Sequence, residues 1–318
     1  MPVQSVHHTV RLSSPKRFGK HVPPSSLGMA LQQVETGVKR SVLMAFEGRS
    51  VATGRPRAWF NSACDVRFLG MDGDEETLLH FEAPTFGEAA SELYRQTELW
   101  AARPPPQWTG FDALAGVLQD VRAGNQDSER FDRQLLQTIA HFRRLLEGDF
   151  DRVGIEEHRT GKPGEAVLDH TTVEIARRLS EATPKNRPVR VVGRLDMLRL
   201  STQSFAIHLD DGNEVRGVLT DGNASGLRAL VNERVLVLGR AVYRPSGRVL
   251  RLDADSVEPG AGLPSIWSKV PGPLVRPVHA ASDYRKPQTS TSGVNAFFGK
   301  WPGPESDEEL IALLDEMS

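Results

Sequence analysis

The N-terminal part of the chain mixes a two-residue period with helical spacing. Apolar and polar residues alternate over residues 6–12, which predicts a strand. Over residues 27–45 the apolar positions recur every three or four residues, as on one face of a helix. An Asp-Gly pair at residues 71–74 separates two apolar runs and predicts a hairpin, because it supplies the positive φ of a tight turn.

Further elements extend this region to residue 183. Helical spacing recurs over 111–123, 128–147 and 171–182, and a short strand is predicted over 153–158. The sequence around Cys64 predicts a buried strand. Together these elements predict one α+β domain over residues 1–183.

Beyond the two prolines Pro184 and Pro188 the pattern changes to a two-residue period. Five short alternating runs are separated by turns, with one helical segment at 224–231 between the third and fourth run. The order β-β-β-α-β-β over residues 184–257 is that of an OB-like five-stranded β-barrel. Gly193 suits a bend in its first strand. The alternative is a small open antiparallel sheet with one helix.

Residues 258–293 lose all apolar periodicity and are rich in proline, serine and threonine. Such a segment buries too little apolar surface to fold, and we expect a disordered linker.

Apolar residues, with helical spacing in the second half, return in residues 294–318, which we expect to bind a partner. Ser306 and Glu309 have the spacing of a capping box at the start of a helix. The apolar stripe of this amphipathic helix could cover the protein's own body or another chain, and the long linker favours another chain. The candidate contact residues are three aromatics, one lysine and three leucines: Phe297, Phe298, Lys300, Trp301, Leu310, Leu313 and Leu314.

The composition limits the kinds of site and the cellular location that we expect. The chain has 318 residues, a formal net charge of −2 and a single cysteine, so neither an internal disulfide nor a cysteine-based zinc cluster can form. The N-terminus lacks an apolar signal-peptide core, and no window is apolar enough to span a membrane. We therefore expect a cytoplasmic protein with no membrane contact.

The chain also lacks the common catalytic motifs. The run 158–162 ends like a phosphate-binding loop, but Gly154 is too far from Gly161 and Pro163 replaces the required hydroxyl. No nucleophile elbow, zinc-protease helix or dinucleotide fingerprint occurs. We expect no enzyme, no catalytic or metal-ligating residues and no cofactor.

The predicted barrel carries many arginines on or near its strands, with Phe205 and Tyr243 nearby. Barrels of this type bind single-stranded nucleic acid through basic grooves and stacking aromatics. The alternative interpretation is a solvated outer face. The candidate nucleic-acid-binding residues are Arg194, Arg199, Arg216, Arg240, Tyr243, Arg244 and Arg248, with Arg190 and Arg251 close by.

The C-terminal motif also carries a resemblance to a known family. The run 296–303, followed by Ser306 and the acidic-leucine helix, resembles the tail of antitoxins that accompany PIN-domain ribonuclease toxins. The remainder looks like an uncharacterised bacterial protein family, notably at 194–197 and 243–248. The resemblance implies an antitoxin-like protein whose tail docks on and restrains or positions a PIN-type ribonuclease, with Lys300 entering the acidic metal site. It does not extend to an antitoxin DNA-binding domain. The alternative function is a nucleic-acid-binding adaptor.

Overall fold

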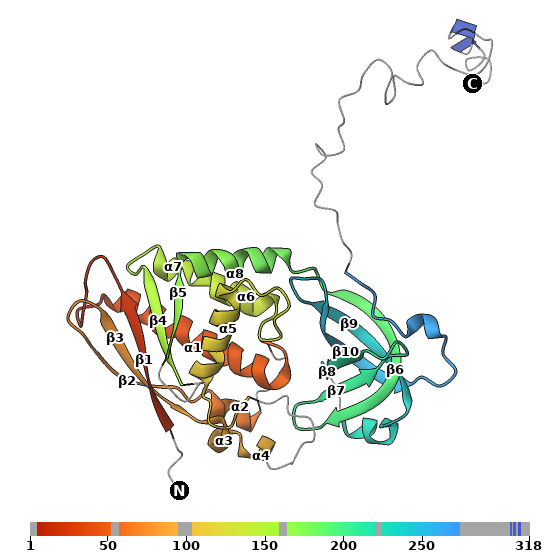
Figure 1. Ribbon diagram of the computed structural model, residues 1–318, viewed down its shortest axis with the longest axis horizontal. Helices are drawn as coiled ribbons and strands as arrows, with labels where there is room; N and C mark the ends of the chain where they lie inside the picture. The colour runs from red at the N-terminus through yellow and green to blue at the C-terminus, as the bar shows by residue number, and fades with distance from the viewer. Residues whose placement is uncertain are drawn as a thin grey trace. The chain divides into compact units, whose positions relative to one another are not determined.

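The computed structural model describes residues 5–51, 57–94, 104–158, 164–220 and 224–273, together with Ser306, residues 308–309 and residues 311–312. The chain divides into two compact units, Met1–Leu274 and Val275–Ser318. The first unit contains a five-stranded sheet covered by helices and a closed β-barrel (Figure 1). The α+β class predicted from the sequence is confirmed.

The sheet is antiparallel throughout, with the strand order β2-β3-β1-β4-β5. Alternate residues of its strands, such as Val10 and Leu12 of β1, are fully buried beneath the helices, while their neighbours face away. The strands are β1 (Ser5–Ser13), β2 (Arg67–Asp72), β3 (Thr77–Pro84), β4 (Arg152–Glu157) and β5 (Gly164–Asp169).

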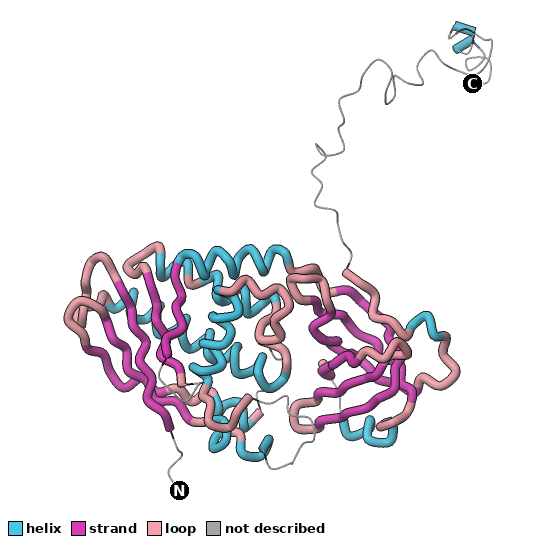
Figure 2. The backbone as a smooth tube through the Cα atoms, viewed as in Figure 1, coloured by secondary structure: helices cyan, strands magenta, loops and turns pink. Residues whose placement is uncertain are grey.

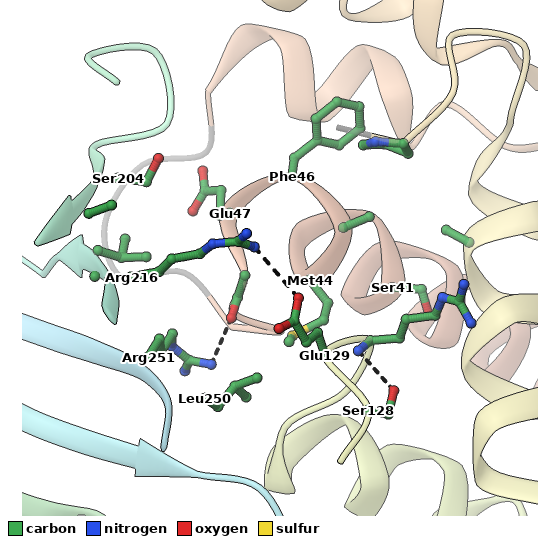
Figure 3. A pocket seen from close by; sticks show the side chains of 18 of the residues that line it. Ser41, Met44, Phe46, Glu47, Ser128, Glu129, Ser204, Arg216, Leu250 and Arg251 are labelled. Atoms are coloured by element: carbon green, nitrogen blue, oxygen red, sulfur yellow. Dashed lines mark hydrogen bonds and ion pairs between the residues drawn. The ribbon is translucent and has the colours of Figure 1, made fainter. Parts of the chain in front are cut away.

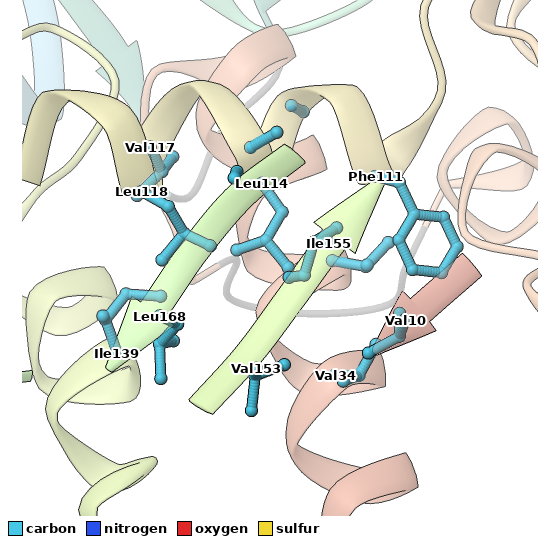
Figure 4. Close-up of a cluster of buried hydrophobic side chains, with 14 of the residues drawn as sticks. Val10, Val34, Phe111, Leu114, Val117, Leu118, Ile139, Val153, Ile155 and Leu168 are labelled. Atoms are coloured by element: carbon cyan, nitrogen blue, oxygen red, sulfur yellow. The ribbon is translucent and has the colours of Figure 1, made fainter. Parts of the chain in front are cut away.

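The helices pack on one face of this sheet and enclose the larger core. Figure 4 shows Phe111 and Leu114 of α5 against Val10, Ile155 and Leu168 of the strands, and all five are fully buried. The helices are α1 (Pro24–Glu47), α2 (Ala58–Ala63), α3 (Phe86–Ala89), α4 (Ser91–Tyr94), α5 (Gly110–Arg122), α6 (Arg133–His141), α7 (Arg143–Leu146) and α8 (His170–Ala182).

Two local predictions differ from the structure. The helix expected over 128–147 begins later, because the Asp132 carboxylate accepts from the Leu135 amide and sets the N-terminus at Arg133. It then divides at Phe142, whose amide bonds the Ile139 carbonyl three residues back. The strand expected around Cys64 is the end of α2; the thiol is nonetheless buried, and burial raises its pKa to about 12.

The second half of the unit is a closed barrel (Figure 2). Its strand order is β10-β8-β7-β6-β9, and β8 and β10 are parallel. This confirms the OB-like barrel over the open sheet. The helical segment is a 3-10 helix, η1 (Ala224–Leu230). The strands are β6 (Arg187–Arg199), β7 (Ser204–His208), β8 (Glu214–Leu219), β9 (Arg234–Tyr243) and β10 (Val249–Pro259).

Gly193 permits a close approach of β6 and β7. A Cβ atom at this position would lie 2.7 Å from the His208 carbonyl oxygen, which no side chain tolerates. Gly193 is therefore needed for close packing of the two strands, whereas the irregularity in the pairing of β6 lies between Leu195 and Met197.

The barrel unit extends past the boundary expected at residue 257. Glu258 pairs with Leu236 as β10 continues to Pro259, and the chain then stays on the barrel. The Ser268 hydroxyl donates to the Asp210 carboxylate at 2.6 Å, and the Tyr243 hydroxyl donates to the Pro271 carbonyl at 2.9 Å. The predicted linker thus begins too early, while residues 274–293 lie outside the described residues. No helix in the described part of the chain could cross a membrane.

Candidate functional site

The barrel docks on the helical layer through Arg251 of β10. Its side chain is 9% exposed and its Nη1 atom donates to the Gly48 carbonyl at 2.8 Å. The same atom lies 3.3 Å from the Asp132 carboxylate at the start of α6, and Nε bonds Asp253 at 2.7 Å. A buried guanidinium with several oxygen partners holds the two halves of the unit in one arrangement.

Three further arginines of the barrel contact the loop between α5 and α6. Arg244 Nη2 donates to the Glu129 carboxylate at 2.8 Å, and its Nη1 donates to the Asp127 carbonyl at 2.7 Å. Arg216 lies 3.5 Å from Glu129, and Arg248 lies 3.7 Å from Asp127. Three candidate nucleic-acid residues, at 216, 244 and 248, therefore have acidic partners within the same chain.

The other candidates lie in three environments. Arg194 and Arg240 are exposed on the outer surface of β6 and β9, where no described residue pairs with them. Arg199 lines the cavity described next. Tyr243 and Phe205 are fully buried, and burial raises the pKa of the tyrosine hydroxyl. Neither ring can stack on a base.

A cavity of about 780 Å³ lies where the barrel meets the helices (Figure 3). Its apolar lining includes Met44, Phe46 and Leu250, and its charged lining includes Arg216 and Glu129. Pockets of this size accept small organic molecules. The sequence did not indicate this cavity, because its wall combines segments that are far apart in the chain.

The charges around the cavity are largely paired with each other. Arg130 bonds Asp120 at 2.9 Å, and Glu47 bonds Arg49 at 2.9 Å. Ser41, which is 1% exposed, has a hydroxyl without a hydrogen-bond partner in the described chain. Nowhere in the described residues do three histidine, cysteine or acidic side chains form a group that could hold a metal ion. The wall is suited to binding by shape and apolar contact.

A second polar cluster surrounds His8 beneath α5. His8 Nδ1 lies 3.2 Å from the Glu156 carbonyl, which only accepts, so Nδ1 carries the proton. Nε2 lies 3.0 Å from the Thr109 hydroxyl, whose single proton also has the Asp112 carboxylate within 3.0 Å. Burial lowers the pKa of His8, although Asp112 opposes the shift. The ring stacks on Phe111, so this histidine belongs to a satisfied core network.

The C-terminal candidates Phe297, Phe298, Lys300, Trp301, Leu310, Leu313 and Leu314 lie outside the described residues. Five neighbouring residues are described. The Ser306 amide donates to the Glu309 carboxylate at 2.8 Å, and the Glu309 amide donates back to the Ser306 hydroxyl at 3.3 Å. Residues 308–309 and 311–312 are helical, and Ile311 is 61% exposed.

The chain was compared with known protein families, curated proteins and solved structures. No family model, curated protein or solved structure matches it.

Proposed function

We propose that this chain is an antitoxin-like binding protein whose C-terminal segment docks on a PIN-type ribonuclease and restrains or positions it. The observation that carries the proposal is the reciprocal pair between Ser306 and Glu309. It starts a helix where the antitoxin-like motif requires one, and Ile311 on that helix is exposed. The protein would act in the cytoplasm and perform no catalytic step of its own.

The energetics of the segment favour docking on a second protein. A helix of roughly a dozen residues is marginal in water by itself. Each large apolar side chain that a partner buries contributes about 1.5–3 kcal/mol. Phe297, Phe298, Trp301 and the leucine stripe could together offset the cost of ordering the segment.

Lys300 would perform a different task from its aromatic neighbours. The active site of a metal-dependent nuclease gathers carboxylates around its metal ion. An ammonium group placed among those carboxylates would compete with the metal. The aromatic residues would then determine affinity, and Lys300 would determine inhibition.

The first test isolates the anchor residues in the full-length chain. Tagged protein is used to capture partners from the source cells, and the captured protein is assayed for metal-dependent ribonuclease activity. Trp301→Ala should weaken capture by about 2 kcal/mol, the magnitude of an interface hot spot. Trp267→Ala, outside the tail, is the matched control. If the captured protein has no nuclease activity, or if Trp301→Ala binds as wild type does, the proposal fails.

The second test separates inhibition from affinity. At saturating concentration, Lys300→Ala should still bind the nuclease but leave it active, because the carboxylates then regain their metal. Lys300→Arg, which keeps the charge, should remain inhibitory. If the nuclease in the saturated Lys300→Ala complex is as inactive as in the wild-type complex, inhibition comes from another group.

The alternative, a nucleic-acid-binding adaptor, is supported by Arg190, Arg194 and Arg240. These three residues are exposed on adjacent strands and have no ion-pair partner in the described residues. Phosphate contacts release counterions, so binding to a single strand should weaken steeply with salt. Arg194→Ala should reduce the slope of log affinity against log salt by roughly 0.7. Arg143→Ala in the helical layer should leave the slope unchanged.

A further inference from the structure

Strand β2 contains no buried residue although it includes three large apolar side chains. Phe68 is 42% exposed and Leu69 is 51% exposed, and Met71 is only partly covered. The strand forms one edge of the sheet, and its outer side pairs with no strand in the described chain. A free edge with exposed apolar residues is a template for pairing with another strand.

A bulge at Leu69 arranges the side chains of β2 in two sets. Phe68 pairs with Phe81 and Gly70 pairs with His80, so Leu69 is the extra residue. As a result, Arg67 and Asp72 share the face turned away from the helices. Phe68 and Met71 share the opposite face, since they pair with the buried residues of β3.

We infer that two copies of this chain associate through their β2 strands, paired antiparallel about a two-fold axis. In that register Arg67 lies opposite Asp72 of the second copy, and Phe68 lies opposite Met71. The face of each residue matches that of its counterpart, as antiparallel pairing requires. The resulting dimer would contain one continuous ten-stranded sheet, twice the observed five strands.

Charge complementarity indicates that the strand pairing with β2 is β2 of a second copy. The edge strand has a positive residue at its first position and a negative residue at its last, so reversing its direction produces its own complement. Leu69 lies opposite Gly70, and a Cβ atom built at Gly70 would meet nothing within 4 Å. There is room at that position for the leucine of the other copy.

The ion pairs that Arg67 and Asp72 form within their own chain do not oppose dimerisation. Arg67 pairs with Asp65 at 2.7 Å, and Asp72 lies 3.2 Å from His80. Both pairs are exposed, with Arg67 and Asp72 each 67% accessible. Exposed ion pairs contribute little to stability, so little is lost when they rearrange.

The test is a charge swap in the full-length chain, measured by sedimentation equilibrium over a range of concentrations. Wild type should reach twice the monomer mass at high concentration. Arg67→Asp and Asp72→Arg should each raise the dissociation constant about tenfold or more, because like charges then lie opposite each other twice. Arg190→Asp makes the same charge change on the barrel and should have no effect.

Mixing the two single variants completes the test. Each fails to pair with itself, but the aspartate introduced by Arg67→Asp in one copy then faces the arginine introduced by Asp72→Arg in the other. The mixture should therefore dimerise about as tightly as wild type. A wild type that stays monomeric, with β2 exposed or covered by another segment or protein, overturns the inference. A wild-type dimer that is insensitive to both charge reversals, or single variants that do not associate on mixing, overturns it as well. The inference does not depend on the proposed function.

Discussion

At the scale of single residues, Asp132 joins three parts of the molecule. Its carboxylate accepts from the Leu135 amide as the cap of α6, and from the amide and hydroxyl of Ser50 at 3.0 and 2.6 Å. It also lies 3.3 Å from Arg251 of the barrel. Burial alone would raise the pKa of Asp132, but Arg251 and the hydrogen bonds lower the pKa below its ordinary value.

Asp132→Asn should therefore destabilise the chain at neutral pH. The amide can still cap α6, but Arg251 loses one of its two carboxylate partners and keeps only Asp253. The cost should therefore be below the roughly 3–5 kcal/mol of a buried charge with no counter-ion. Because the folded pKa lies below 3.8, the ionic contribution is complete above that pH and is lost as the pH falls through the folded pKa. Denaturant unfolding at pH 7 and at acid pH measures both effects. Equal stability of the two proteins at pH 7 would contradict the prediction.

His8 gives the protein a second pH dependence, which comes from a base where that of Asp132 comes from an acid. Its pKa is lowered from 6.5, chiefly by burial, while Asp112 and Glu156 act in the opposite direction and His158 adds to the lowering. The unfolded histidine therefore takes up its proton at a higher pH than the folded one. Stability should fall as the pH decreases below 6.5 until the folded pKa is reached.

His8→Gln should remove this component, because glutamine does not titrate. The variant loses stability at pH 7 from imperfect packing, but its unfolding free energy should change less than that of wild type below pH 6.5. Urea unfolding at a series of pH values measures the difference, and His21→Gln is the surface control. Parallel curves for wild type and His8→Gln would show that His8 is not the titrating group.

At the scale of secondary-structure elements, the ends of helices depend on short polar contacts. Thr109 and Asp112 form a capping box on α5, and Ser306 and Glu309 form one at the C-terminal helix. The first is buried within the core, where packing also stabilises the helix. The second is exposed, so its helix depends more on the cap.

Ser306→Ala should weaken the start of the C-terminal helix by about 1 kcal/mol. The Glu309 amide then loses its acceptor, and its hydrogen exchange should accelerate roughly fivefold by the same energy. Residue-resolved amide exchange on the full chain gives the measurement. Glu308→Ala is the matched control, since Glu308 takes no part in the reciprocal pair. Unchanged protection of Glu309 in Ser306→Ala would contradict the cap.

At the scale of the whole first unit, the barrel and the helical layer are joined by bonds of unequal strength. Arg248 has a 76% exposed side chain, and its distance to Asp127 is 3.7 Å. Arg251 is buried among carboxylates and a carbonyl group. Exposed ion pairs contribute little, whereas a buried pair that loses one partner is strongly destabilised.

Arg251→Ala should uncouple the barrel from the helices. Calorimetry should then show two unfolding transitions where wild type shows one, because the barrel keeps its own core but loses its most buried ion pair with the helical layer. Arg248→Ala removes the same type of side chain from the same part of the barrel and should leave one transition. A single transition in Arg251→Ala would mean that the remaining contacts, including that of Arg244 with Glu129, suffice to couple the halves.

The sequence by itself determined the α+β class, many of the elements and the barrel, but not the strand order of the N-terminal sheet or its strand β5. Strand alternation and the turns between residues 184 and 257 predicted the barrel, because a two-residue period with one buried face is a local property. The capping pattern of Ser306 likewise depends on residues three apart, and the structure has both bonds. The strand predicted around Cys64 failed because short apolar runs fit a buried helix end equally well.

Only the tertiary structure decided what the barrel arginines contact. The sequence placed them on or near the barrel strands and left a solvated outer face as one interpretation, but alternation carries no information on what covers a face. The loop between α5 and α6 supplies Asp127, Glu129 and Asp132, which are far from these arginines along the chain. The same holds for the buried ring of Tyr243 and for the cavity lined by Ser41. Contacts between distant segments depend on how elements pack, and one sequence read along its length does not contain that arrangement.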